Sequence, residues 1–297
     1  MFKFNYVLER KFDSGRKLLD YITVGSANRK IDFGFRGHSN SSWELETSLS
    51  RYVSNMGILN TSSNQRKKHS LSLASKKLLA EFKKSLIINN GLAKERSEDI
   101  DVWQYGQHYG LPSPLLDWSY SPFVALFFAL LEPNKTSQTS SRAVWQIDLD
   151  ILEHLNRGLV NDFRPTVNIS PKSKLEQAYP ELEVIYPNFH NNPRIAFQQG
   201  LFIKNEYFPT IERWLYMITQ VLPMNASERP TIEKYVFDCN EKQRLELLDI
   251  LDKMNVNYRT LFPDIHGAVQ AAIDQTVRSF LNPEVKMIGF LKENFDN

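Results

Sequence analysis

The chain has 297 residues, a formal net charge of +2, a hydrophobic fraction of 42% and an aromatic fraction of 12%. This apolar content is enough for a folded core and argues against a disordered chain. The near-neutral charge excludes a strong overall attraction to nucleic acid or anionic lipid. The longest apolar run, residues 123–131, is too short to cross a bilayer, and the first residues lack the apolar stretch of a secretory signal. We therefore expect a cytoplasmic protein without membrane segments, in which the single cysteine, Cys239, forms no intrachain disulfide.

The first third of the chain is predicted to form helix, strand and helix. Apolar residues at helical spacing indicate a helix over residues 9–23. Aromatic alternation in residues 32–37 indicates a strand that ends at Gly37. Residues 52–70 are polar and contain few apolar side chains, so we expect a mobile loop there. In residues 71–88 apolar positions recur at helical intervals with lysine pairs between them, which predicts a basic amphipathic helix.

The middle of the chain carries the strongest helix signal. Two prolines end any preceding helix, and residues 115–118 are expected to form a short strand. Ser121 as N-cap and Pro122 at the first helical position predict a helix that continues over residues 123–130. Because this helix is apolar on nearly every side, we expect it at the centre of the fold.

The remaining elements alternate irregularly. Strands are expected at residues 143–149, 182–186, 200–203 and 235–237, and helices near residues 212–221, 240–254 and 268–280. This order favours an α+β fold, with a mixed central sheet flanked by helices, over a doubly wound parallel sheet. We expect a single domain over residues 1–297 with a basic helical insertion near residues 66–90.

Four blocks of sequence stand out over about residues 28–275: Phe35-Arg36-Gly37 with Trp43 and Leu49; Gln107-His108-Tyr109-Gly110-Leu111-Pro112 continuing through residues 115–118 and 121–129; Arg194 to Phe202; and Leu261 to Gly267. Together these blocks resemble the FRG domain family. Two positions depart from the family pattern. Ser113-Pro114 stands where Thr-Arg is usual, which removes a cation, and His266 stands where an acidic residue is common.

A second, weaker resemblance is to the layout of ADP-ribosyltransferases. Those enzymes hold NAD with an Arg or His beside a Gly on the first strand, use a Ser or Thr motif ahead of a helix, and carry a late Glu or Gln. The resemblance implies an ADP-ribosyltransferase-like fold with NAD as substrate. The implied NAD-binding residues are Arg36, Gly37, Ser119 and Ser121, and the candidates for the late residue are Gln199, Glu181 and Glu183.

The residue types suit that chemistry. Arg36 can bind a pyrophosphate through two parallel hydrogen bonds, and Gly37 allows the backbone to approach a ligand. Tyr109 or Tyr120 could stack on nicotinamide, and His108 could act as a base toward an acceptor. A late carboxylate would favour the oxocarbenium charge that develops as nicotinamide leaves.

Each of these residues also has a structural interpretation. Arg36 can pair with Asp117 and tie two strands together, which would make Asp117 structural. His108 can be a core histidine whose hydrogen bonds are satisfied. Glu181 and Glu183 would face one side of a strand, either as an acid pair in a cleft or as part of a solvated strand surface.

The basic helix offers an acceptor site. Its lysines, Lys76, Lys77, Lys83 and Lys84, can bind a phosphate backbone or simply form a solvated helix face.

The leading hypothesis is an NAD-dependent ADP-ribosyltransferase-like enzyme, such as a bacterial toxin or antiphage effector, that modifies nucleic acid or protein. The alternatives are a non-catalytic nucleotide or nucleic-acid binding module and a nucleotide or nucleic-acid hydrolase. No His-x-x-x-His motif or paired aspartate cluster predicts a metal site.

Overall fold

The computed structural model describes residues 7–26, 32–57, 64–90, 98–134, 139–161, 181–187, 193–219 and 231–281. The strands are β1 (Val7–Phe12), β2 (Phe33–His38), β3 (Leu115–Ser119), β4 (Ser140–Asp148), β5 (Glu183–Ile185), β6 (Gly200–Lys204) and β7 (Ile232–Cys239). The helices are α1 (Gly15–Ser26), α2 (Ser48–Asn55), α3 (Asn64–Asn90), α4 (Asp99–His108), α5 (Pro122–Ala129), α6 (Leu149–Asn161), α8 (Pro193–Phe197), α9 (Ile211–Thr219), α10 (Glu241–Lys253), α11 (Tyr258–Leu261) and α12 (Ile265–Leu281).

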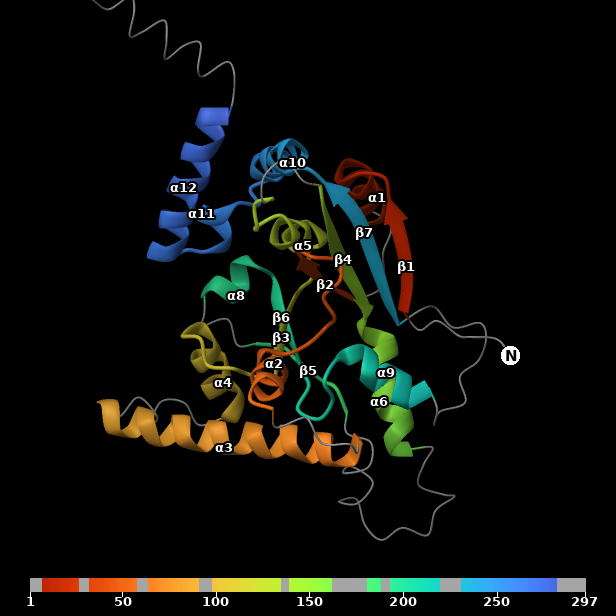
Figure 1. Cartoon of the computed structure of the whole chain (residues 1–297), viewed down its shortest axis with the longest axis vertical. Coiled ribbons are helices and arrows are strands. Elements are labelled where there is room, and N and C mark those ends of the chain that lie inside the picture. The colour runs from red at the N-terminus through yellow and green to blue at the C-terminus, as the bar shows by residue number, and fades with distance from the viewer. Residues whose placement is uncertain are drawn as a thin grey trace, which may run out of the picture.

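The strands form one mixed sheet in the order β1-β7-β4-β2-β3-β6-β5 (Figure 1). β1 runs parallel to β7, and the other neighbouring strands are antiparallel. Helices cover both faces of the sheet, so the predicted α+β fold with a mixed central sheet is confirmed.

Helix α5 lies at the centre of the fold, as its apolar sequence predicts. Ser121 caps it by accepting a hydrogen bond from the backbone N–H of Val124, and Pro122 occupies the first turn. On the face of the sheet that α5 covers, α1, α5 and α10 form one core with Phe35, Val144 and other inward side chains. On the opposite face α6 and α9 pack against the strands around two tryptophans, Trp118 and Trp145.

Two predictions near the start of the chain are wrong. The predicted helix over residues 9–23 begins only at Gly15, because Val7–Phe12 pairs with β7 as a strand. The mobile loop predicted over residues 52–70 is helical at both ends, where α2 continues to Asn55 and α3 begins at Asn64. The cause is a small cluster in which Leu49 and Val53 of α2 are buried against Leu71 of α3. Residues 58–63, in the middle of that segment, lie outside the described residues.

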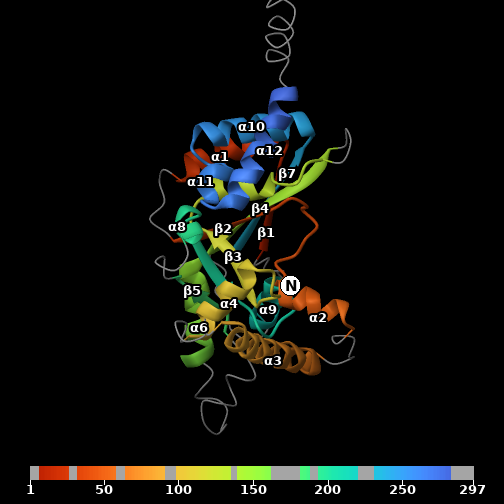
Figure 2. The same ribbon diagram turned by 90° about the vertical axis from the view of Figure 1, so that its left-hand side faces the viewer.

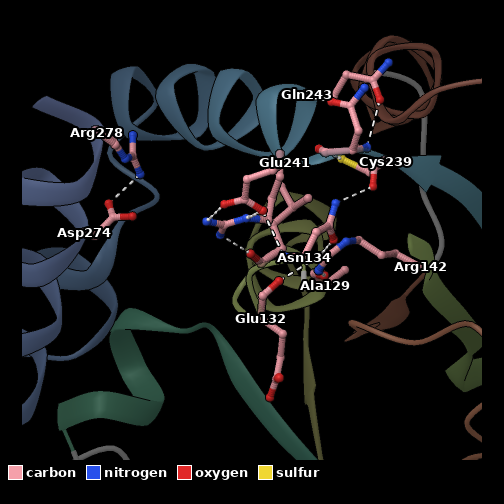
Figure 3. A network of polar contacts seen from close by, with 12 residues as sticks. Ala129, Glu132, Asn134, Arg142, Cys239, Glu241, Gln243, Asp274 and Arg278 are labelled. Atoms are coloured by element: carbon pink, nitrogen blue, oxygen red, sulfur yellow. Dashed lines mark hydrogen bonds and ion pairs between the residues drawn. The ribbon is translucent and has the colours of Figure 1, made fainter. Parts of the chain in front are cut away.

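Two buried arginines close the C-terminal end of α5. Arg142 Nη1 donates to the carbonyl oxygen of Ala129 at 2.6 Å and Arg142 Nη2 to that of Glu132 at 2.7 Å (Figure 3). Arg244 Nη1 donates to the carbonyl oxygen of Leu130 at 2.8 Å. Carbonyl groups at the end of a helix lack partners within the helix, so these guanidinium groups satisfy them and fix the chain that follows.

Helices α3 and α10 lie at opposite ends of the molecule (Figures 1 and 2). Helix α3 has 27 residues and contains several lysines. No helix in the described part of the chain combines the length and apolarity needed to cross a membrane.

Candidate functional site

The central sheet separates between β2 and β3. In the described strands, β2 pairs with β4 along its whole length, whereas its pairing with β3 is confined to Phe35 and Ser119. Beyond that pair the side chain of Arg36 bridges the two strands, since its Nη1 donates to the carbonyl oxygen of Asp117 at 2.6 Å. A side chain thus replaces backbone pairing where the strands diverge.

A cavity of about 860 Å³ opens at this separation. This volume lies within the range of small-molecule and cofactor sites. Its walls come from β2 and the loop after it, α4, β3, α5 and α8. The polar side chains central to the site are Arg36, His38, Gln107, His108, Asp117 and Arg194. Arg36 and His108, which the sequence suggests as partners in one site, therefore border the same cavity.

Asp117 provides a carboxylate inside this cavity. Its side chain is 61% exposed, although surrounding protein crowds it enough that desolvation raises the pKa of its carboxyl against the opposing effect of Arg36. The closest charged atoms of Arg36 and Asp117 are 3.9 Å apart, so the short contact of Arg36 is with the Asp117 backbone and not with its carboxylate. The expectation that Asp117 is only a structural partner of Arg36 does not account for this exposed carboxylate.

Gln107 fixes the orientation of Asp117. Its side-chain Nε2 donates to both carboxylate oxygens, at 2.8 and 2.9 Å. The amide itself is oriented by Ser113, whose buried hydroxyl donates to Gln107 Oε1 at 2.5 Å and accepts from the backbone N–H of Leu115. In residues 107–113, Gln107 and Ser113 thus act together to hold the carboxylate of Asp117. The hydroxyl that Ser113 contributes stands at a position where the family pattern has Thr.

Arg36 and His38 lie side by side on β2. Arg36 Nε donates toward His38 Nε2 at 3.2 Å, and Trp145 Nε1 donates to His38 Nδ1 at 3.1 Å. A neutral imidazole accepts at only one ring nitrogen, so each tautomer of His38 satisfies one of these contacts. Desolvation lowers the pKa of His38 to about 3, helped by the nearby charge of Arg36. His38 is therefore neutral at physiological pH, whereas Arg36 remains a cation although burial lowers its pKa.

A later part of the chain adds a second arginine. Arg194 of α8 lines the cavity, and its guanidinium carbon lies 4.1 Å from the centre of the Phe262 ring. Gln198 also lines the cavity and donates from Nε2 to the carbonyl oxygen of Leu261 at 3.0 Å. Gly267 lets this segment close on itself, because a Cβ there would lie 1.9 Å from the carbonyl oxygen of Phe262. The segments predicted from Arg194 to Phe202 and from Leu261 to Gly267 are thus packed together beside the cavity.

Three predicted NAD-binding residues make contacts within the fold that account for them structurally. Gly37 borders the cavity, but a Cβ at this position would lie 1.9 Å from the carbonyl oxygen of Ala125, so the glycine is needed for close packing of α5. Ser119 also borders the cavity, and its buried hydroxyl donates to the Gln198 carbonyl oxygen at 2.7 Å. Ser121 caps α5 and does not belong to the cavity wall.

Other predicted residues lie away from the wall of the cavity. Tyr109 is 70% exposed and contacts His108 ring to ring, while Tyr120 packs against the core. Gln199 has a left-handed backbone with φ of 48°. Glu183 lies on strand β5 at the edge of the sheet, where it pairs with Lys204. Glu181 is an exposed residue two positions before that strand.

The basic residues of α3 are partly neutralised. Lys83 pairs with Asp99 and Lys84 Nζ lies 2.6 Å from Glu81 Oε1, whereas Lys76 and Lys77 are exposed. Within the described ranges no group of three or more His, Cys, Asp or Glu residues could hold a metal ion.

Comparison with known proteins gives a family match for part of the chain. The family model named FRG domain matches residues 32–138, and over these residues the chain is similar to that domain. The matched segment contributes β2, α2, α3, α4, β3 and α5, and therefore Arg36, His38, Gln107, His108 and Asp117 of the cavity. No curated protein and no solved structure matches the chain.

Sequence reasoning does not predict four of the polar residues of the site, and three of them, His38, Gln107 and Asp117, lie within the matched residues. The sequence favours a structural role for Asp117 and includes Gln107 only as part of a motif. Arg194 lies beyond the matched residues. Nothing local in the sequence indicated that α8 would bring Arg194 to the same place.

Proposed function

We propose that the cavity binds NAD and that the chain is an NAD-dependent ADP-ribosyltransferase-like enzyme. The observation that carries this proposal is the presence of Arg36, His108 and a held carboxylate, Asp117, on the wall of one cavity of about 860 Å³. Arg36 and Arg194 would bind the pyrophosphate, since guanidinium groups suit its oxygens. The cavity volume fits a ligand of dinucleotide size.

In the proposed reaction the bond between nicotinamide and ribose breaks, and its electron pair leaves with nicotinamide. The ribose carbon becomes positively charged, and the carboxylate of Asp117 stabilises that charge. An acceptor nucleophile then forms a bond to this carbon, and His108 removes the proton from the acceptor. Asp117 supplies the negative charge in this proposal, since Glu183 lies outside the cavity wall and the amide of Gln199 carries no charge.

The acceptor in this proposal is a nucleic acid or a protein. The exposed Lys76 and Lys77 on α3 would contact a phosphate backbone. We place the enzyme in the cytoplasm, as a bacterial toxin or antiphage effector, where NAD and such acceptors are available.

The test measures nicotinamide released from NAD in the presence of nucleic-acid and protein acceptors. Asp117→Asn should lower the release rate by at least roughly 100-fold, the effect of removing one preorganised electrostatic group, while NAD binding measured by calorimetry persists. The matched control is Glu183→Gln, the same change on an exposed glutamate at the edge of the sheet, which should leave the rate unchanged. Arg36→Ala is less informative, because Arg36 also bridges β2 and β3.

Three outcomes separate the alternatives. Release of nicotinamide without any acceptor would indicate hydrolysis of NAD. NAD binding without release would indicate a non-catalytic nucleotide-binding module. If the wild-type protein neither binds nor cleaves NAD with any acceptor, the proposal is wrong.

A further inference from the structure

Helix α12 carries an apolar stripe on its solvent side. The helix lies at the edge of the fold beside α10 and α11 (Figure 1), and its large apolar side chains recur every three or four residues, the spacing of one helix face. These side chains are between 41% and 82% exposed: Ile265, Val269, Ile273, Val277 and Phe280. The apolar face of a surface helix ordinarily packs on the core. In α12 that face points outward, which is typical of an interaction surface.

The inner side of α12 attaches the helix to the fold through other residues. Gly267 packs closely on the backbone of Phe262. Arg278 pairs with Asp274 at 2.6 Å (Figure 3) and also with Asp249 of α10. Asp274 and Arg278 are the only Asp, Glu, Lys or Arg residues of α12, and their side chains are 17% and 15% exposed. The exposed surface of the helix therefore contains none of these charged residues.

The hydroxyl groups on the solvent side already have hydrogen-bond partners. Thr276 Oγ1 donates to the carbonyl oxygen of Ala272 at 2.8 Å, and Ser279 Oγ donates to that of Thr276 at 2.7 Å. Burying a hydroxyl is costly mainly when it loses its hydrogen bond to water without gaining another. These two hydroxyls keep their bonds within the helix, so this surface can be covered at little cost.

The stripe is complementary to a second copy of itself. With the smaller side chains between the large ones included, its positions are 265, 268, 269, 272, 273, 276, 277 and 280. The steps between these positions alternate between three and one, and they are the same when read from either end. Two antiparallel copies related by a twofold axis would therefore place every stripe position opposite another stripe position. The axis would pass between Ala272 and Ile273, where the small alanine allows close approach of the two helices.

We propose that the chain forms a homodimer through the apolar stripe of α12, with the two helices antiparallel about a twofold axis. A helix of 17 residues is about 25 Å long, and the stripe extends over its length. Interfaces of homodimers are more apolar than other interfaces and depleted in charge at their core, which matches the uncharged outer surface of α12. Because α12 contributes no residue to the cavity wall, this inference is independent of the proposed function.

The test is analytical ultracentrifugation of the full chain. The wild-type protein should sediment as a dimer at about 10 µM and dissociate on dilution. Ile273→Asp should raise the dissociation constant at least roughly 100-fold, because it would bury two like charges beside the axis. The matched control is Ile88→Asp, the same change at an isoleucine of α3 that is 81% exposed, which should leave the dimer intact.

A mixing experiment tests the twofold arrangement. Ile273→Lys should also be monomeric, and an equimolar mixture of Ile273→Asp and Ile273→Lys should form dimers again, since opposite charges would then meet beside the axis. Recovery on mixing would also show that both variants are folded.

Three results would overturn the inference. A wild-type chain that stays monomeric would mean that something other than a second copy covers the stripe, such as residues 282–297 or a different protein. A dimer that survives Ile273→Asp would place the interface elsewhere. A mixture of the two charged variants that remains monomeric would contradict the antiparallel pairing.

Discussion

His38 shows how the fold sets the charge of a single residue. It is 6% exposed, contacts Trp145 through one ring nitrogen and faces the cation of Arg36 with the other. Both desolvation and the arginine disfavour the imidazolium, so the pKa of His38 falls from 6.5 to about 3. His38, which lies beside the arginine proposed to bind the pyrophosphate, therefore contributes no charge of its own at physiological pH.

This shift predicts a pH dependence of stability. Between pH 6.5 and about 3 the unfolded chain binds a proton at His38 that the folded chain does not, so the free energy of unfolding decreases as the pH falls. The contribution is about 1.4 kcal/mol per pH unit in that window. His38→Asn, whose amide can still accept from Trp145, should remove it. Urea unfolding at about pH 6 and about pH 5 measures the difference, and identical pH dependences for the two proteins would contradict the prediction.

At the scale of elements, the contact between β2 and α5 determines the shape of the cavity. Gly37 lets the strand approach the helix, and α5 in turn contributes Ala125 and Phe128 to the cavity wall. Buried arginines hold the far end of α5 through its last carbonyl groups. The site therefore depends on how closely one strand and one helix pack.

Gly37→Ala should destabilise the protein by about 3 kcal/mol, because the added methyl group overlaps backbone atoms of α5 that cannot move independently. Gly34→Ala on the same strand is the matched control. Its added carbon would lie 3.1 Å from a side-chain methyl of Ile147, so the cost should stay below about 1 kcal/mol. Urea unfolding compares the two variants, and equal losses would mean that the approach of α5 does not require a glycine.

At the scale of the whole molecule, Cys239 reports on the stability of the central sheet. It is the only cysteine of the chain, lies fully buried at the end of β7, and burial raises the pKa of its thiol to about 11. A protonated, inaccessible thiol is a poor nucleophile. We expect the native protein to resist a thiol reagent at about pH 8 and the denatured protein to react at once with one equivalent.

The same thiol tests ligand binding. If NAD binds only the folded state, it should slow the labelling of Cys239 in proportion to its concentration above the dissociation constant. ADP-ribose should slow labelling too, whereas an unrelated anion such as sulfate at the same concentration should not. Rapid labelling of the native protein would contradict the buried position of Cys239.

Local sequence signals were sufficient for several elements. The Ser-Pro start and apolar sequence of residues 121–130 predicted α5 and its central position, because capping and burial depend on neighbouring residues. The alternation in residues 143–149 predicted β4 for the same reason. The start of the first helix was wrong because the pairing of Val7–Phe12 with β7 is set by residues more than 200 positions away.

Sequence patterns alone give the α+β class and the motifs that resemble the FRG domain, and they name Arg36 and His108 as candidate site residues. The tertiary structure adds that Asp117 is a cavity carboxylate held by Gln107, that Gly37 serves the packing of α5, and that Arg194 reaches the same cavity. The physical reason is that alternation gives the side of a strand on which a residue lies, but not where neighbouring strands separate. That separation depends on strand order and register across the whole sheet, which no local pattern encodes.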